Sequence, residues 1–312
     1  MGRADVYLQP DAPDPVLSEK TILDLAARHT GRATALLEVD ETGGEARAYL
    51  LTGDVVVKTQ RPHRLRLRTS LDGEALILGV LALPLGERVP ELMGHGRADT
   101  AEGPVEYLVM GRMPGEALIR RPVDDSDRSK LVRDVGALLA KLHDVPTGPL
   151  LSVSGGVHVD HHGGDLRRRL EPGFADLVDL IAQHPERWSV PATPQEVAAA
   201  ALAMIPAEFT PVLLHSNPGP THVFCTADGS LSGLIDFGDS YLSHPAMDLH
   251  RWPDPADRLT LREGYLDGAA ASTDFDAAWT AAMIHTDMAV MASRPERASA
   301  AKADLTVRLH SW

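Results

Sequence analysis

The feature that most constrains this chain is the stretch from residue 212 to residue 248, VLLHSNPGPTHVFCTADGSLSGLIDFGDSYLSHPAMD. An apolar strand leads into a polar loop that starts at His215, and a second short strand follows His222. An Asp-Gly pair then predicts a tight turn into a third strand, which ends directly before Asp236. Two polar clusters are therefore expected at neighbouring ends of paired strands. This is the layout of a catalytic loop followed by a metal-binding aspartate.

These residues resemble the catalytic region of the aminoglycoside phosphotransferase and choline kinase family, which is related to protein kinases. The family pattern is H-G-D-x-x-x-x-N, then a hairpin, then I-D-[FW]. Here it reads H-S-N-x-x-x-x-H from residue 215 and I-D-F-G from residue 235. The resemblance places Asn217 where the family has its catalytic aspartate. It places His222 where the family has an asparagine that helps to hold magnesium, a position at which macrolide-type members also carry histidine.

The length and composition fit two packed lobes. The chain has 312 residues, 44% of them hydrophobic, which is enough for a sizeable core. Apolar runs stop well before the roughly 18 residues that a membrane span requires, and no signal peptide opens the sequence. The one cysteine, Cys225, cannot form an internal disulfide and is expected to be a buried strand residue. We therefore expect a cytoplasmic protein with no membrane association, either a monomer or a homodimer.

The charge balance excludes one class of partner. The formal net charge is −14, whereas proteins that bind nucleic acids rely on clustered lysine and arginine. The acidic excess fits a cationic substrate, and it fits general solubility equally well.

The N-terminal part predicts a small sheet with helices. Residues 1 to about 17 are expected to form a loose arm, and an amphipathic helix follows from Ser18 to a stop at Gly31. Strands at 33–39, 46–52 and 55–58, separated by Gly-containing turns, predict an antiparallel meander that ends at Lys58. The resemblance implies that Lys58 contacts the nucleotide phosphates and pairs with Glu74 on the next helix. Taken separately, Lys58 could be a solvated strand end and Glu74 a favourable charge near a helix N-terminus.

Between these two residues lies the one clearly basic segment, TQRPHRLRLRTS. We interpret it as an exposed charged connection rather than a phosphate-facing or substrate-facing element. No glycine-rich loop of the G-x-G-x-x-G type precedes it, and members of the family often lack one.

The later part predicts a hinge and then a set of helices. A buried strand at 107–110 ends at glycine and proline residues, and the resemblance implies that Met110 and Arg112 bind the adenine there through their backbone. A helix at 125–143, capped by Asp125 or Ser126, closes with the family pattern L-H-x-x-P. Histidines and aspartates at 158–165 resemble a metal cluster only in composition, because their spacing is irregular. Further helices are expected at 165–184, 194–204, 257–268, 274–292 and 295–309.

Asn217 raises the main question about the chemistry. A carboxamide can orient a hydroxyl group but cannot accept its proton, and general-base assistance is worth about 10² to 10⁴ in rate. Asn217 is therefore a natural substitution in a pseudokinase-like binding protein, an engineered inactivating change, or a tolerated variant in an enzyme that uses another base such as His215. Further departures from the pattern at Ser216, at Pro218 and in the S-H-P at 243–245 favour natural divergence.

The sequence predicts an α+β, protein-kinase-like fold with two lobes. Residues 1–110 would form a nucleotide-binding lobe with a small antiparallel sheet, and residues 111–312 a larger, mainly helical catalytic lobe. The resemblance spans roughly residues 20–290. It implies transfer of a phosphoryl group from ATP or GTP to a hydroxyl of a small polar, aminoglycoside-like molecule, with Mg²⁺ held by Asp236 and His222. The alternative is a catalytically silent protein that keeps the pocket for a nucleotide or small ligand.

Overall fold

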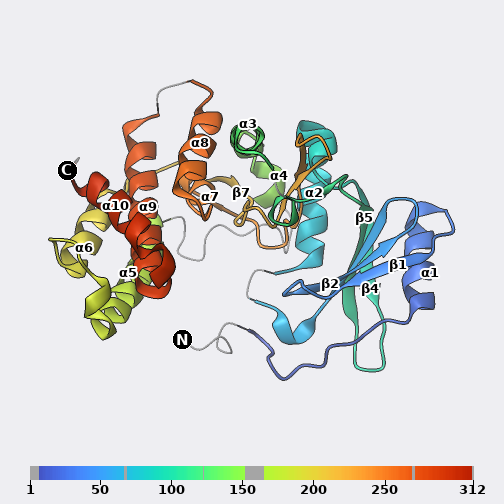
Figure 1. Cartoon of the computed structure of the whole chain (residues 1–312). Coiled ribbons are helices and arrows are strands. Elements are labelled where there is room, and N and C mark those ends of the chain that lie inside the picture. Colours follow the sequence, from blue (N-terminus) through green and yellow to red (C-terminus); the bar gives the residue numbers. More distant parts are fainter. Residues whose placement is uncertain (1–6, 67–68, 122, 152–164, 269–270, 311–312) are drawn as a thin grey trace. The chain divides into compact units, whose positions relative to one another are not determined.

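The computed structural model describes residues 7–66, 69–121, 123–151, 165–268 and 271–310. The chain forms two compact units (Figure 1). Unit 1 contains residues 1–123, 145–158 and 220–240, and unit 2 contains residues 124–144, 159–219 and 241–312. Asp236 therefore belongs to the same unit as Lys58, although 178 residues separate them. The assignment of lobes to 1–110 and 111–312 stays a prediction.

Unit 1 is built on a five-stranded antiparallel sheet with the strand order β1-β2-β3-β5-β4. The predicted meander of the first three strands is confirmed. Side chains alternate between the two faces of the central strand, as in any β-strand. Val55 and Val57 join the hydrophobic core that includes Ile22 and Leu25 of the first helix, whereas Lys58 pairs with Glu74 of the second helix. The strands are β1 (Leu36–Asp40), β2 (Ala46–Leu51), β3 (Val55–Gln60), β4 (Leu92–Ala98) and β5 (Val105–Gly111).

Two helices pack on this sheet, and both begin at a serine cap. Helix α1 (Glu19–Thr30) starts at Ser18, whose hydroxyl accepts from the Thr21 amide, and it ends at Gly31 in the left-handed conformation. Helix α2 (Leu71–Leu85) starts at Ser70, whose hydroxyl accepts from the amide of Gly73. The predicted start at Ser18 and stop at Gly31 are therefore confirmed. Short helical segments of unit 1 are η2 (Pro62–Arg64), η3 (Gly86–Arg88), η4 (Leu118–Arg120) and α4 (Gly148–Leu151).

A second, three-stranded sheet in unit 1 leads to Asp236. Its order is β6-β8-β9, with β6 (Glu116–Ala117), β8 (Val223–Cys225) and β9 (Leu231–Leu234). The turn between β8 and β9 is closed by Asp228, which accepts from the Ser230 amide at 3.2 Å. Gly233 lies so close to the backbone of Arg88 that a Cβ atom would overlap its carbonyl oxygen. Cys225 is fully buried, as the sequence predicted.

Unit 2 is mainly helical. It contains α3 (Asp125–His143), α5 (Leu166–Gln183), η5 (Pro185–Arg187), α6 (Pro194–Met204), α7 (Ala246–Leu249), α8 (Pro255–Leu266), α9 (Thr273–Ser293), η6 (Pro295–Arg297) and α10 (Ala298–His310). Two short strands, β7 (Val212–Leu214) and β10 (Tyr241–Ser243), pair antiparallel within it. Helices α3 and α8 approach closely at Gly136 and Gly264, where a Cβ atom would overlap a carbonyl oxygen of the other helix. None of the described helices has the length and apolarity to cross a bilayer.

The predicted helices of unit 2 are found, with small shifts at their ends. Helix α6 begins with a capping box, in which Thr193 and Glu196 bond each other reciprocally. The N-cap of α3 is Asp124 rather than Asp125 or Ser126. Element ends of this kind commonly differ by one or two residues.

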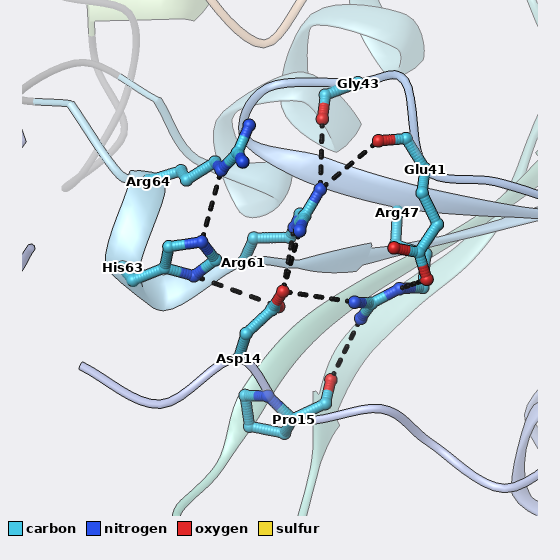
Figure 2. A network of polar contacts seen from close by, with 8 residues as sticks. All are labelled: Asp14, Pro15, Glu41, Gly43, Arg47, Arg61, His63 and Arg64. Atoms are coloured by element: carbon cyan, nitrogen blue, oxygen red, sulfur yellow. Dashed lines mark hydrogen bonds and ion pairs between the residues drawn. The ribbon is translucent and has the colours of Figure 1, made fainter. Parts of the chain in front are cut away.

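The expectation of a loose N-terminal arm is wrong for residues 14–17. Pro15 and Leu17 are buried, and Asp14 accepts hydrogen bonds from Arg47 and Arg61 (Figure 2). Two buried cations that share one carboxylate give this segment a fixed place on the sheet. Sequence patterns miss such ties because each partner lies more than 30 residues away.

Candidate active site

The centre of the site in unit 1 is the lysine at the end of the meander. Lys58 Nζ donates to Glu74 Oε2 at 2.7 Å and to Asp236 Oδ1 at 2.8 Å. Lys58 is only 8% exposed and Glu74 is fully buried. Neither residue is therefore a solvated surface charge, so the interpretation of Lys58 as an exposed strand end is excluded. Strand β3, helix α2 and the end of β9 each contribute one member of this triad.

The charge on Lys58 is stabilised by its two partners. Burial works to lower the pKa of Lys58, but the carboxylates of Asp236 and Glu74 outweigh it and hold that pKa above its ordinary value. The ammonium group therefore stays protonated at neutral pH. Such a fixed cation can neutralise an anionic ligand without having to gain a proton first.

Asp236 is held by the backbone as well as by its side chain. It lies two residues after the end of β9 and has a φ of 69°, which is unusual for a residue other than glycine. The next amide, from Phe237, donates to Glu74 Oε1 at 3.3 Å, and the Phe237 ring is completely buried. The Asp236 side chain itself is 45% exposed, so its carboxylate is open to a ligand. Strained backbone of this type is often found at functional sites.

His222 lies beside Asp236 because the two residues flank the β8–β9 hairpin. The amide of Ile235 donates to the His222 carbonyl at 3.1 Å, and His222 Nε2 lies 3.3 Å from Asp236 Oδ2. A carboxylate and an imidazole are thus adjacent. The described residues contain no cluster of three or more histidine, cysteine or acidic side chains placed to hold a metal ion. A cation bound beside Asp236 and His222 would therefore be coordinated by these two side chains.

These two ligands fit a divalent cation that a bound phosphate also coordinates. The Asp236 carboxylate is the type of oxygen donor that Mg²⁺ prefers, and Mg²⁺ usually binds through one or two carboxylates together with substrate phosphates and water. Imidazole is a less typical partner for Mg²⁺ than oxygen is. The two residues therefore fit Mg²⁺, with Asp236 as the better-suited ligand and His222 as the less typical one.

The two hinge candidates lie at the end of β5. Met110 is buried and pairs with Val56 of β3 and with Leu92 of β4. The amide of Arg112 donates to the Asp54 carbonyl at 2.8 Å, so it already has a partner within the unit. A contact from Arg112 to an adenine would have to use its carbonyl oxygen or side chain. The role of both residues in nucleotide binding stays a prediction.

The loop that carries Asn217 belongs to unit 2 and is organised by one buried carboxylate. Asp248 accepts from the backbone amide of His215 at 2.7 Å and from that of Ser216 at 2.8 Å. The ring of His143, at the end of α3, lies 3.2 Å from the same carboxylate and also bonds Tyr265 at 3.0 Å. His143 therefore has a structural role, because it supports the carboxylate that organises the loop.

The two candidate catalytic residues of this loop, His215 and Asn217, are separated by one residue and contact each other. The Asn217 amide donates to His215 Nδ1 at 3.3 Å, so His215 accepts with that nitrogen. His215 is fully buried, and Ser216 between them has a φ of 80°. This geometry indicates that His215 shapes the loop. Its use as an alternative base, and the catalytic role of Asn217, stay predictions.

Asp248 is a loop-organising residue that sequence analysis did not single out. An aspartate among the apolar residues of PAMDL was the only signal available. Acidic residues are almost never fully buried unless they are paired, which makes such a position informative. The partners of Asp248 could not be inferred, because His215 and His143 lie 33 and 105 residues away.

Replacing Asp248 with asparagine is expected to lower the free energy of unfolding by about 2–4 kcal/mol, because a carboxamide cannot accept from both amides of the loop. Chemical denaturation would measure this change. The matched control is Asp134→Asn on the exposed side of α3, which should change stability by less than about 0.5 kcal/mol. Equal effects of the two substitutions would contradict the role assigned to Asp248.

The predicted candidate metal cluster at 158–165 falls mostly outside the described residues. His158, Asp160, His161 and His162 are not among them, whereas Asp165 is the N-cap of α5 and accepts from the Arg168 amide at 2.9 Å.

Solved structures of antibiotic phosphotransferases share this fold. APH(2")-IIia in its GDP and kanamycin complex superposes with a TM-score of 0.55 at 17% identity, covering 94% of this chain and 98% of that chain. Macrolide 2'-phosphotransferase MphH from Brachybacterium faecium gives 0.53 at 19% identity, with 93% and 98% coverage. Spectinomycin phosphotransferase APH(9)-Ia with ADP and spectinomycin gives 0.54 at 11%, with 94% and 95% coverage. These similarities confirm the α+β, protein-kinase-like fold.

A comparison with curated proteins gave no match. The family profile described as "APH: Phosphotransferase enzyme family" matches residues 37–283, which is most of the chain. The matched range contains β2, β3, α2, the Asn217 loop and the Asp236 hairpin, so it includes the residues on which the resemblance was based. The chain belongs to the phosphotransferase enzyme family.

Proposed function

We propose that the chain transfers the γ-phosphoryl group of ATP or GTP to a hydroxyl of a small polar molecule, as antibiotic kinases do. The observation that carries this proposal is the triad in which Lys58 bonds both Glu74 and Asp236. A lysine on β3 paired with a helix glutamate, together with a metal-binding aspartate after a strand, is the arrangement that phosphoryl transfer requires in kinases. Family membership supports the same reaction class.

Each residue has a role that its chemistry permits. Lys58 would bind the phosphates as a permanent cation, and Glu74 would hold Lys58 in place. Asp236 and His222 would hold Mg²⁺, which neutralises phosphate oxygens when it is bound. Asn217 would orient the acceptor hydroxyl through its carboxamide without removing the proton.

The proposed acceptor is a hydroxylated, cationic compound of the aminoglycoside type. The net charge of −14 is compatible with a cationic acceptor. The similar structures include complexes with kanamycin and spectinomycin, and a macrolide phosphotransferase. These three acceptor types define the first panel to be tested.

One observation favours a second candidate, a silent binding protein. The position of the catalytic base is occupied by Asn217, while Lys58, Glu74 and Asp236 keep a geometry suited to nucleotide binding. A protein of this kind would bind ATP or GTP without turnover.

Two measurements test the proposal and separate it from this alternative. ATP or GTP at about 100 times its dissociation constant, with Mg²⁺, should stabilise the protein by about 2.7 kcal/mol, which thermal unfolding would detect. Nucleotide consumption is then measured with the panel of hydroxylated antibiotics. Stabilisation together with acceptor-dependent turnover supports the enzyme, and stabilisation without turnover in any acceptor supports the binding protein. The absence of any thermal shift would contradict both.

A further inference from the structure

The basic segment after β3 holds the turn between β1 and β2. We interpreted this segment from the sequence as an exposed connection, but Arg61 is only 7% exposed. Its Nη1 donates to the carbonyl oxygens of Glu41 at 3.3 Å and Gly43 at 3.4 Å (Figure 2). The interpretation as an exposed connection is therefore wrong for Arg61. One guanidinium fixes the first half of the turn that runs from residue 41 to residue 45.

Arg61 is itself anchored by the N-terminal segment. Its Nη2 and Nε donate to Asp14 Oδ2 at 2.8 and 3.1 Å, and Arg47 Nη2 donates to the same oxygen at 3.1 Å. Arg47 also donates to the Pro15 carbonyl and to Glu41 Oε1, at 3.1 and 2.8 Å. Figure 2 shows the two arginines converging on Asp14. The start of the turn is thus tied to the sheet through two buried guanidinium groups, although the Glu41 carboxylate itself is 55% exposed.

Arg66 holds the other end of the turn and connects it to the Asp236 loop. Its Nη2 lies 2.5 Å from Glu45 Oε1 and also pairs with Asp239 Oδ2. Thr69 donates to the second oxygen of Asp239 at 3.2 Å. Asp239 is three residues beyond Asp236. A single side chain therefore bridges the β1–β2 turn and the loop that carries the proposed metal ligand.

Arg66 also offsets the negative charge of the carboxylates around Asp236. Asp236, Asp239, Glu45 and Glu74 are all acidic. Burial raises the pKa of Glu45, Arg66 acts in the opposite direction, and the charges of Asp239 and Asp236 raise it further. These groups therefore lie within electrostatic reach of one another. Removing Arg66 would take one positive charge away from these four carboxylates, so an anionic phosphate entering the site would be repelled more strongly.

We propose that Arg66 is a positioning residue for the nucleotide phosphates, acting through Glu45 and Asp239. It holds the turn at residues 41–45 and the loop at 236–239 in one arrangement, so that the site is preorganised. It also offsets the carboxylates around Asp236. The inference rests on the proposed function in naming the nucleotide, whereas the coupling of turn and loop is a property of the protein alone.

The binding test compares Arg66→Met with Arg64→Met. Arg64 is the matched control, because it lies in the same segment and its Nε donates to the neighbouring His63 ring at 3.2 Å (Figure 2). Calorimetric titration with ATP and Mg²⁺ should show a dissociation constant at least about tenfold higher for Arg66→Met than for Arg64→Met. Binding of adenosine, which has no phosphate, should be unchanged, and Arg66→Lys should recover part of the loss. Equal ATP affinity in the two methionine variants, or tighter binding in Arg66→Met, would overturn the proposal.

A second measurement needs no nucleotide. Hydrogen exchange of the amides at 43–45 and 237–239 should be faster in Arg66→Met than in Arg64→Met, while exchange in α1 stays the same. Unchanged exchange in both segments would overturn the coupling of turn and loop. If the unaltered chain binds no ATP, the proposed function fails, and the exchange result still decides whether Arg66 positions these segments.

Discussion

Replacing Asp236 with asparagine is expected to lower the rate of phosphoryl transfer by about a thousandfold. The substitution preserves size and leaves an oxygen that can accept from Lys58, but it removes the negative charge required of the proposed metal ligand. Metal ions supply several kcal/mol of charge stabilisation in such reactions, and each 1.36 kcal/mol corresponds to about a factor of ten. Turnover is measured with saturating nucleotide and acceptor. The Mg²⁺-dependent part of nucleotide affinity, measured by titration, should be lost in the same variant.

The matched control for this prediction is Asp99→Asn, which removes an equal charge from an exposed position after β4. It should leave both turnover and the Mg²⁺ dependence unchanged. Lys58 keeps Glu74 as a partner in Asp236→Asn, so the fold should be retained and chemical denaturation can check this. A rate within tenfold of the unaltered chain would rule out Asp236 as the main metal ligand.

Replacing Asn217 with aspartate is expected to raise turnover by about 10² to 10⁴, the usual contribution of a general base. The two side chains have the same shape, and the Asn217 backbone amide already bonds His215, so the loop should keep its conformation. The expected change is in the maximal rate rather than in nucleotide affinity. Steady-state kinetics with separate measurement of the two parameters would show this.

Asn217→Ala is the companion variant, because it removes both the carboxamide and any chance of proton transfer. If the carboxamide orients the acceptor, the alanine variant should be slower than the unaltered chain. An aspartate variant that is no faster than the unaltered chain would mean that position 217 does not limit the reaction. With nucleotide binding intact and no turnover in either chain, the silent binding protein would be the better description.

Local patterns predicted the fold and one part of the site. The meander and the two ends of α1 are set by residues that lie close together in the sequence, and both were found. The pairing of Lys58 with Glu74 was expected from family spacing, and the two are only 16 residues apart. The spacing of a motif therefore carried information that single residues did not.

Long-range charge pairing accounts for what the sequence did not reveal. Arg66 and Asp239 are 173 residues apart, and the partners of Asp14 lie 33 and 47 residues away. Neither hydrophobic periodicity nor turn chemistry records such a pairing, because both describe only neighbouring residues. A basic segment that looked solvated therefore proved to contain a buried arginine, and a proline-rich start that looked loose proved to be fixed at residues 14–17.

The burial of Cys225 provides a probe for the opening of the β8–β9 hairpin. It is the only cysteine in the chain, it is completely covered in β8, and burial raises the pKa of its thiol. A thiol-specific reagent can reach the sulfur only when that strand opens. The labelling rate therefore reports how often the hairpin that carries His222 and Asp236 comes apart. No fluorophore or engineered cysteine is needed for this measurement. A ligand that binds at the hairpin would lower the labelling rate of Cys225.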